Sequence, residues 1–243
     1  MTTGIPSSNS SSTSLSTSSS SNIALINLSY LLISILFRIV MLKLNCSDSD
    51  IAIAASRVKN GGTVVYPTDT VYGLGCDPYN DSAVETILKI KDRNADKHMP
   101  LLCSSIINAN KIGNLDGLSK KLAEIFWPGA LTIIIELTDK RISSKVTASM
   151  NSIGVRVPDH ICALKLIDAC GGVLVGTSAN RSGSVSAKSA TKTMIKDFDV
   201  LIDAGETPGI DSTVLKISDT KITIVREGRI KRKNIEEALA KHV

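Results

Sequence analysis

The residues of this sequence that could do chemistry are cations, hydroxyls and glycines placed just after predicted strands and helices. Lys91 and Arg93 lie two residues apart, and Lys97 follows four residues after Arg93. At the end of a predicted helix, Lys91 and Arg93 could simply complement the negative end of the helix dipole. An arginine fork and a lysine point charge could also bind the oxygens of a polyphosphate. Spacing alone favours the first interpretation and leaves the second open.

A further cation, Arg156, lies in or at the end of a predicted strand, directly before Val157-Pro158. A guanidinium inside a core needs an anion, so we predict a bound carboxylate beside it. The run Thr177–Asn180 follows another predicted strand, and a glycine-spaced polar loop over residues 203–213 follows a third. Each loop alone is typical of an ordinary turn. Together they predict a substantial pocket for an anionic ligand.

These loops are organised around one strand–loop–helix segment. Thr63–Tyr66 is a β-branched and aromatic run typical of a strand, and Pro67 ends it because proline has no N–H for a sheet ladder. Residues 68–75 then form a loop rich in hydroxyls and glycines. The pattern Ser82-x-x-Glu85 predicts a capping box for the following helix, which ends in the two cations.

The rest of the chain alternates short helices with short strands. Hydrophobic runs predict further strands at 99–103, 131–137, 153–157, 173–175, 200–203, 213–217 and 222–225. Helical spacing predicts helices at 51–58, 105–112, 118–126, 160–169, 190–195 and 234–241. This alternation favours a single α/β domain, over residues 41–243, with a twisted mixed β-sheet flanked by helices.

Composition excludes several classes of protein. With 43% hydrophobic residues, the 243-residue chain can bury one good-sized core. Its net charge of +5 suits phosphate-bearing ligands but is far below that of a dense nucleic-acid-binding stripe. The five cysteines form no Cys-x-x-Cys pair, and the three histidines show no metal-ligand spacing. We therefore expect no protein metal site, reduced thiols and a cytoplasmic protein.

Residues 1–40 differ from the rest of the chain. Half of residues 1–22 are serine, which predicts disorder, and residues 23–40 form an apolar block interrupted by polar side chains. This block is at the short limit for a membrane span. Three interpretations stay open: a weak membrane anchor, an extra helix on the domain, or an extension preceding a true start at Met41. We favour the third, because patterned globular sequence begins directly after Met41.

The common nucleotide-binding motifs are absent from the sequence. Residues 171–177 superficially resemble a P-loop but have no lysine after the last glycine. No Gly-x-Gly-x-x-Gly joins a predicted strand to a helix. Any phosphate site must therefore be built from side chains and irregular loops.

Several motifs, taken in order, resemble the YrdC family of threonylcarbamoyl-AMP synthases. They are PTDTVYGLG at 67–75, the Lys91-x-Arg93 pair, WPGALT at 127–132, GVRVPDH at 154–160, TSANRSG at 177–183, the DAG and DSTV motifs within 203–214, and Arg226. The resemblance covers about residues 50–232 and includes the Lys-x-Arg and Ser-x-Asn hallmarks of the family. It implies a large, positively charged concave pocket on a twisted α/β sheet.

The resemblance also implies a reaction. The enzyme would be a nucleotidyltransferase that joins L-threonine, bicarbonate and ATP into threonylcarbamoyl-AMP and releases pyrophosphate. Mg²⁺ would be carried with ATP as the cofactor. Proteins of a threonylcarbamoyl-transferase complex would then form N6-threonylcarbamoyladenosine in tRNA. An affinity for tRNA or double-stranded RNA would fit this role, whereas a membrane partner would not.

Site residues follow from matching the motifs position by position. The catalytic hallmark set would be Lys91, Arg93, Ser178 and Asn180. L-Threonine would contact Thr70, Arg156, Gly176 and Ser212, with Arg156 on its carboxylate or on the carbamate. ATP would be held by Arg93, Lys97, Ser152, Ser178, Ser186 and Arg226.

Two departures from the family pattern and two alternatives accompany this interpretation. Leu102 stands where some relatives carry a histidine near the threonine site, and the chain ends just past the synthase domain, as in short single-domain members. The main alternative is a non-catalytic RNA- or ribosome-binding paralogue, although only 3% aromatic residues argue against base stacking. The related HypF-like domain normally lies in a much longer chain.

Overall fold

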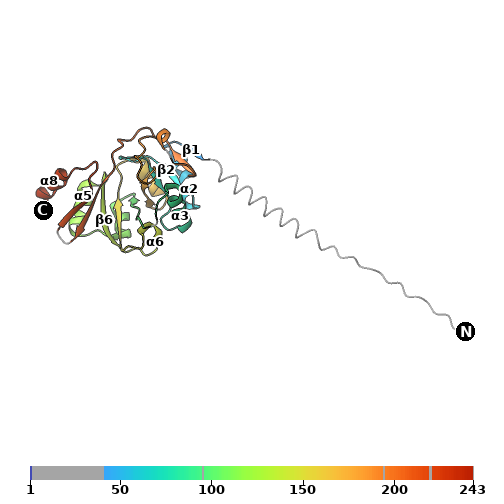
Figure 1. The fold of residues 1–243 in the computed structure, drawn as a ribbon, viewed down its shortest axis with the longest axis horizontal. Coiled ribbons are helices and arrows are strands. Elements are labelled where there is room, and N and C mark those ends of the chain that lie inside the picture. The colour runs from blue at the N-terminus through green and yellow to red at the C-terminus, as the bar shows by residue number, and fades with distance from the viewer. Residues whose placement is uncertain (2–40, 95, 194, 219–220, 243) are drawn as a thin grey trace. The chain divides into compact units, whose positions relative to one another are not determined.

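Two mixed β-sheets, in place of the single sheet expected, form the framework of residues 41–243 (Figure 1). The computed structural model describes residues 1, 41–94, 96–193, 195–218 and 221–242, so the interpretations of the N-terminal segment lie outside the described residues. Residues Met41–Val243 cluster as one unit. No helix in the described part of the chain combines the length and the hydropathy that a membrane crossing needs.

The first sheet has the strand order β1-β10-β2-β3-β9. Its strands are β1 (Leu42–Leu44), β10 (Val200–Ile202), β2 (Val64–Tyr66), β3 (Gly73–Gly75) and β9 (Thr177–Ser178). β1 and β2 lie parallel to β10, whereas β3 is antiparallel to both β2 and β9. The first strand, β1, therefore pairs with β10, a strand that lies far along the chain.

The second sheet has the order β12-β11-β6-β7-β4-β8, with β5 beside β6. Its strands are β4 (Leu101–Cys103), β5 (Gly113–Asn114), β6 (Leu131–Leu137), β7 (Ser152–Arg156), β8 (Val173–Val175), β11 (Thr213–Ser218) and β12 (Lys221–Arg226). The pairs β4–β7 and β6–β11 are parallel, and the other neighbours are antiparallel. The strand predicted at 131–137 matches β6 residue for residue.

The central strands are buried on both faces, because alternate residues enter different hydrophobic clusters. In β2, Val65 belongs to one cluster, whereas Val64 and Tyr66 belong to another. In β4, Leu101 joins the first cluster and Leu102 the second. Helices α2 (Asp48–Lys59) and α7 (Ile161–Ala169) complete the second cluster. Leu102 is thus held in a packed interior as well as near the pocket described below.

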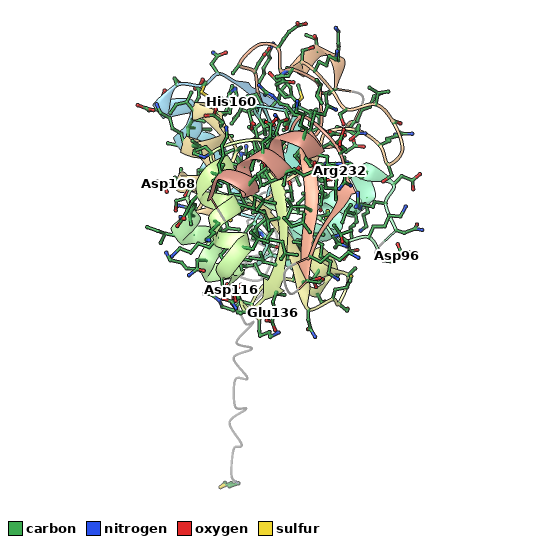
Figure 2. The ribbon with its side chains drawn as sticks, turned by 90° about the vertical axis from the view of Figure 1, so that its left-hand side faces the viewer. Asp96, Asp116, Glu136, His160, Asp168 and Arg232 are labelled. Atoms are coloured by element: carbon green, nitrogen blue, oxygen red, sulfur yellow. A yellow bond between two sulfur atoms is a disulfide. The ribbon has the colours of Figure 1, made fainter. Side chains whose placement is uncertain are left out.

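The remaining helices lie along the sheets, as the mixed α/β prediction requires. They are α3 (Asp81–Lys91), α4 (Ile106–Ile112), α5 (Gly117–Phe126), α6 (Ser144–Thr147) and α8 (Arg232–His242), while a single 3₁₀ turn at Ala190–Lys192 replaces the helix predicted at 190–195. Figure 2 looks onto α5 and α8, with Asp116 at the start of α5 and His160 just before α7.

Helix α3, which ends in the predicted cations, begins differently from the prediction. Asn80 caps it, because its side-chain oxygen accepts a hydrogen bond from the N–H of Ala83 at 3.1 Å. Ser82 lies inside the first turn, and Glu85 forms ion pairs with two lysines, Lys89 and Lys145. The predicted capping box is therefore wrong, because the helix begins two residues earlier than predicted and Asn80, in place of Ser82, accepts the hydrogen bond from its first turn.

A disulfide joins Cys46 and Cys162, so the expectation of reduced thiols is wrong for this pair. The two Cα atoms lie 5.5 Å apart although 116 residues separate them in sequence. Packing of α2 against α7 creates this proximity, which no local spacing of cysteines could reveal. Cys76, Cys103 and Cys170 are free, and burial raises the pKa of the Cys103 thiol to about 12.

Candidate functional site

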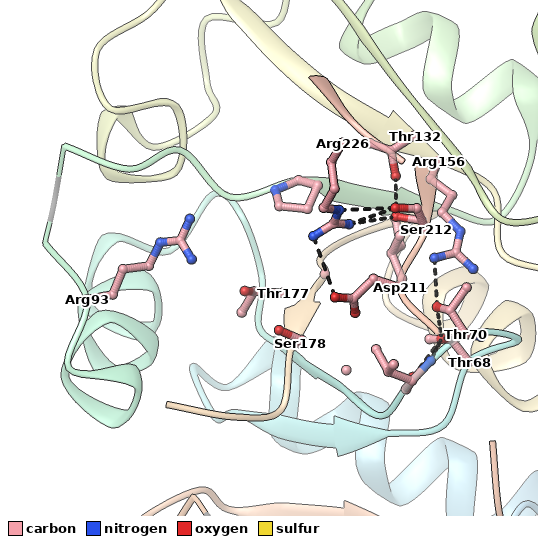
Figure 3. Close-up of a pocket in the computed structure, with 15 residues that line it drawn as sticks. Thr68, Thr70, Arg93, Thr132, Arg156, Thr177, Ser178, Asp211, Ser212 and Arg226 are labelled. Carbon is pink, nitrogen blue, oxygen red and sulfur yellow. Dashed lines mark hydrogen bonds and ion pairs between the residues drawn. The ribbon is translucent and has the colours of Figure 1, made fainter. Parts of the chain in front are cut away.

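A pocket of about 660 Å³, counted with its open mouth, is built from residues of both sheets (Figure 3). Its lining combines hydroxyls, three arginines, one carboxylate and a few apolar groups: Thr68, Thr70, Val71, Gly73, Arg93, Pro100, Leu102, Thr132, Arg156, Gly176, Thr177, Ser178, Asp211, Ser212 and Arg226. All four residues predicted to contact threonine are in this set. Three of those predicted for ATP, Arg93, Ser178 and Arg226, are there too.

Arg156 reaches the pocket from the last position of β7 and is only 4% exposed. Its Nε donates to the carbonyl of Gly129 at 2.8 Å, and its Nη1 donates to Thr70 Oγ1 at 3.0 Å. Its Nη2 donates to Asp69 Oδ1 in a buried ion pair. Burial lowers the pKa of Arg156, and the Asp69 carboxylate opposes that shift. The anion predicted beside this guanidinium is therefore, in this structure, a carboxylate of the chain itself.

The loop between β2 and β3 is folded around the hydroxyl of Thr68. Thr68 Oγ1 donates to the carbonyl of Val71 at 2.7 Å and accepts from the backbone N–H groups of Thr70 and Val71 at 3.2 Å. Thr68 Oγ1 also lies 2.9 Å from Thr70 Oγ1. Because this turn satisfies its own polar groups, it holds the Thr70 hydroxyl in place between Thr68 and Arg156.

A second cluster forms the opposite wall, where β6, β11 and β12 lie side by side. The hydroxyls of Ser212 and Thr132 are 2.9 Å apart. Arg226 Nη2 donates to the Ser212 carbonyl at 2.9 Å and to Ser212 Oγ at 3.2 Å. These contacts fix the Ser212 hydroxyl at the pocket surface, and Figure 3 shows Thr132, Ser212 and Arg226 joined in this way.

Asp211 places a carboxylate within this largely cationic pocket. Its Oδ2 lies 3.8 Å from Arg226 Nη1, and its Oδ1 accepts a hydrogen bond from Ser186 Oγ at 3.0 Å. Ser186, predicted to bind ATP, does not line the pocket itself and reaches it through Asp211. The polar pattern of the 203–213 loop predicted a site there but did not single out this carboxylate.

Gly176 lies at the floor of the pocket, between β8 and β9, against Leu102. A Cβ atom at position 176 would lie 2.3 Å from Leu102 Cγ and 2.9 Å from its Cδ1. A glycine is therefore required here for close packing. Gly176, predicted to contact threonine, is thus one of the residues that line the pocket.

Lys91 does not line the pocket, in contrast to the expectation for the hallmark set. Its side chain is 1% exposed, and its Nζ donates to the carbonyl of Asn180 at 2.7 Å and to that of Ser178. Burial, followed by the charge of Arg93, lowers the pKa of Lys91 to about 8. The ammonium therefore supports the backbone of residues 178–180 from behind the pocket wall.

Asn180 also lies behind the wall and holds the loop that follows β9. Its Oδ1 accepts from Ser178 Oγ, and its Nδ2 donates to the carbonyl of Ser184. Of the Ser-x-Asn pair, Ser178 alone lines the pocket. Of the four hallmark residues, Arg93 and Ser178 therefore line the pocket, whereas Lys91 and Asn180 lie behind its wall.

The two cations that follow α3 also differ in position, because Arg93 lines the pocket and Lys97 does not. Arg93 lines the pocket and is anchored by donating from Nη2 to the carbonyl of His98 at 3.0 Å and from Nε to that of Lys97 at 3.3 Å. The Lys97 side chain is exposed and contributes only its carbonyl to this contact. In Figure 3, Arg93 and Arg156 lie on opposite sides of Thr177, Ser178 and Asp211, so the positive charges bracket the pocket.

A shallower, more apolar cleft continues from the pocket across the second sheet. It shares Arg93, Pro100, Thr132, Ser212 and Arg226 with the pocket, and adds His98, Ile134, Gly154, Val214 and Val225. A Cβ at Gly154 would come within 3.1 Å of Thr132 Cγ2, so a side chain at position 154 would crowd Thr132, which lines the same cleft. Ser152, predicted for ATP, lies two residues away on β7 but lines neither cavity.

Sequence reasoning missed Asp69, Thr132 and Asp211 as parts of this site. Asp69 and Thr132 lie inside the PTDT and WPGALT motifs. The sequence therefore pointed to these segments but did not reveal which residues Asp69 and Thr132 contact. In the described residues no group of three or more His, Cys, Asp or Glu could hold a metal ion.

Comparison with known proteins gives this arrangement a context. The family model for Sua5, YciO and YrdC proteins, described as "Telomere recombination", matches residues 56–228. The threonylcarbamoyl-AMP synthase of Bacillus subtilis is 35% identical over 206 residues, which cover 81% of this chain and 58% of the relative. That of Pyrococcus abyssi is 34% identical over 201 residues, covering 78% and 57%. The chain therefore spans somewhat more than half the length of these two relatives.

Solved structures resemble the chain to a similar extent. Sua5 of P. abyssi complexed with L-threonine superimposes with a TM-score of 0.77 at 29% identity, covering 82% of this chain and 61% of that one. YciO of E. coli gives a TM-score of 0.72 at 27% identity, covering 81% of this chain and 98% of that one.

Proposed function

Because this chain belongs to the Sua5/YciO/YrdC family, we propose that it is a threonylcarbamoyl-AMP synthase, a nucleotidyltransferase that uses L-threonine, bicarbonate and ATP. One observation carries the proposal. The four residues expected on threonine and three of those expected on ATP come from distant parts of the chain and line a single pocket. Relatives named for this activity, and the Sua5 structure with L-threonine, support the choice of substrates.

At the threonine end, Arg156 binds the carboxylate or the carbamate. An arginine has five N–H donors, and three of those of Arg156 are used within the protein. The other two have no hydrogen-bond acceptor among the described residues and face an acidic ligand with no need to break an existing bond. The Thr70 and Ser212 hydroxyls then supply neutral hydrogen bonds to the same substrate.

At the nucleotide end, the apolar cleft beside the pocket takes the base and ribose of ATP. Its floor is made by Ile134, Gly154, Val214 and Val225, which suit a flat apolar ring. Arg93 and Arg226 border both cavities and so hold the triphosphate between the base and the threonine end. Lys97 and Ser152, both predicted to bind ATP, line neither the pocket nor the cleft.

The reaction needs two anions to approach one another. The ammonium group of threonine first loses a proton to solvent, and the free amine and bicarbonate then form a carbamate with loss of water. A carbamate oxygen then forms a bond to the α-phosphorus of ATP, and the bond from that phosphorus to the bridging oxygen of the β-phosphate breaks, so that pyrophosphate leaves. Arginines on both sides of the pocket neutralise and position the two reactants, which is the main protein contribution to such transfers. No side chain has to act as a general base.

Mg²⁺ fits this site only as an ion carried by the phosphates. Asp211 is the one carboxylate among the described lining residues, and it is already near Arg226. When bound, the ion would neutralise phosphate charge. Lys91 acts on the reaction by holding the backbone carbonyl of Ser178, and Asn180 acts by accepting a hydrogen bond from the Ser178 hydroxyl; neither contacts ATP directly.

The product is an activated acyl-adenylate, so a partner must consume it. We place the protein in the cytoplasm, where transferase proteins would move the threonylcarbamoyl group to an adenosine of tRNA.

The test uses the full chain with ATP, Mg²⁺ and bicarbonate, with and without L-threonine, and follows pyrophosphate release together with mass spectrometry of the adenylate. Threonine-dependent release with the mass of threonylcarbamoyl-AMP is expected. Arg156→Ala should abolish it, whereas Arg232→Ala, an exposed arginine on α8, should not. ATP binding without any release would refute the synthase and favour the non-catalytic alternative, for which RNA affinity would be measured next.

A further inference from the structure

Asp69 lies between two cavities. It is neither one of the residues predicted to contact a substrate nor part of the predicted hallmark set. Its side chain is 9% exposed and faces Arg156. On its other side is a second open cavity, lined in part by Asp69, Gly129, Asp159, His160 and Arg229. Asp69 is therefore part of the wall behind Arg156, seen from the threonine end of the pocket.

The carboxylate of Asp69 is itself held in place. Its Oδ1 accepts the hydrogen bond from Arg156 Nη2 and another from the backbone N–H of Asp159 at 3.1 Å. Its backbone carbonyl accepts a hydrogen bond from Arg229 Nη1. The loop on one side of Asp69 is fixed by the Thr68 hydroxyl. A carboxylate with its own supports can impose an orientation on its partner.

The guanidinium of Arg156 depends on this partner. Gly129 and Thr70 provide neutral acceptors, and Asp69 provides the charged one. A guanidinium that is 4% exposed would be costly to keep charged without a nearby anion. The three acceptors together also define the plane of the group, which decides where its two unused N–H groups point.

We propose that Asp69 is a positioning residue for substrate binding: it keeps Arg156 charged and turned so that its two remaining N–H groups meet the carboxylate of L-threonine. This inference rests on the proposed function. Asp69 does not touch the substrate and acts only through Arg156. It also reduces the net charge that Arg156 shows to the pocket, so that recognition depends on directed hydrogen bonds more than on charge alone.

Asp69→Asn tests the proposal, with Asp159→Asn as the matched control. Both variants replace a carboxylate by an amide within the same wall, but Asp159 meets Asp69 through its backbone N–H, which the control retains. Calorimetric titration of the full chain with L-threonine and, separately, with ATP gives both affinities. We expect Asp69→Asn to weaken L-threonine binding at least about tenfold, which corresponds to about 1.4 kcal/mol, and to change ATP affinity less than about twofold. The control should bind both ligands as the wild type does.

Arg156→Gln, alone and combined with Asp69→Asn, keeps the proposal testable if the single Asp69 variant folds poorly. The double variant has no unpaired buried charge and should fold. If Asp69 acts through Arg156, adding Asp69→Asn to Arg156→Gln should change threonine affinity less than about twofold. A further tenfold loss would overturn the proposal, because Asp69 would then act by another route.

Two other outcomes are also decisive. Unchanged threonine affinity in Asp69→Asn, or an equal loss of ATP affinity, would overturn the positioning role, the second because it would indicate a collapsed pocket. If the wild-type chain does not bind L-threonine at all while it binds ATP, the proposed function fails first, and this result is distinct from a failure of Asp69→Asn alone.

Discussion

Replacing Gly176 with alanine should destabilise the wild-type protein but not a Leu102→Ala variant. The added Cβ would lie 2.3, 2.9 and 3.1 Å from Leu102 Cγ, Cδ1 and Cδ2, all shorter than the 3.5–4.0 Å at which carbon atoms attract one another. Leu102 is 4% exposed and packed in a core cluster, so it has little room to move away. Overpacking of this kind costs about 1–3 kcal/mol in the free energy of unfolding.

The second background is Leu102→Ala, which removes all three of these carbons. That change alone should cost about 2–5 kcal/mol, because it leaves a cavity. Gly176 is not among the residues with positive φ, so its backbone accepts alanine. Adding Gly176→Ala to Leu102→Ala should then be neutral or stabilise by up to about 1 kcal/mol, since alanine restricts the unfolded chain and its methyl group fills part of the cavity.

The assay is urea unfolding of all four proteins, with the m-value compared to confirm that the same surface is exposed. The two backgrounds should differ by about 1–4 kcal/mol in the effect of Gly176→Ala. An equal cost in both would refute the reasoning, because it would mean that glycine is needed for a reason other than contact with Leu102. In the wild-type background the displaced leucine should also lower L-threonine affinity, which titration would detect.

Further predictions concern the arginines and the helix that leads to them. Arg93→Ala should weaken ATP about 10- to 150-fold with threonine affinity kept, because a charge-assisted hydrogen bond contributes about 1.5–3 kcal/mol; nucleotide titration checks this. The pKa of Lys91 is lowered to about 8, so the folded protein loses this proton before the unfolded chain does, and stability should rise between about pH 8 and 10.5. Lys91→Met should lack that rise in urea midpoints. Asn80→Ala should cost about 1 kcal/mol of unfolding free energy through loss of the α3 cap, measured by the same method.

Local patterns predicted the elements well where a hydrophobic run was long enough. Strand β6 matched its predicted bounds, and the helix ending at Lys91 was found although its cap was misplaced. Strands β3 and β9 were missed because they are two or three residues long and one contains two glycines, which no propensity favours in a strand. With them the division into two sheets was missed as well.

The site was predicted as a set of residue types but not as a set of contacts. The requirement of Arg156 for an anion was derived correctly, yet the anion found is Asp69, 87 residues earlier in the chain. The hallmark lysine, Lys91, was predicted only as a member of the catalytic set, and its contacts to the backbone carbonyls of Ser178 and Asn180 were not foreseen. Both differences depend on how distant segments pack, which residue spacing along one sequence does not record.

The pairing of β1 and β2 with β10 has a consequence for synthesis on the ribosome. Leu42 pairs with Val200, and Val64 also pairs with Val200, so the strand that joins them emerges only after most of the chain has been made. Until then both early strands have exposed edges, which invite pairing with other chains. Nascent chains stalled before β10 should therefore need more protection by chaperones than those stalled beyond it.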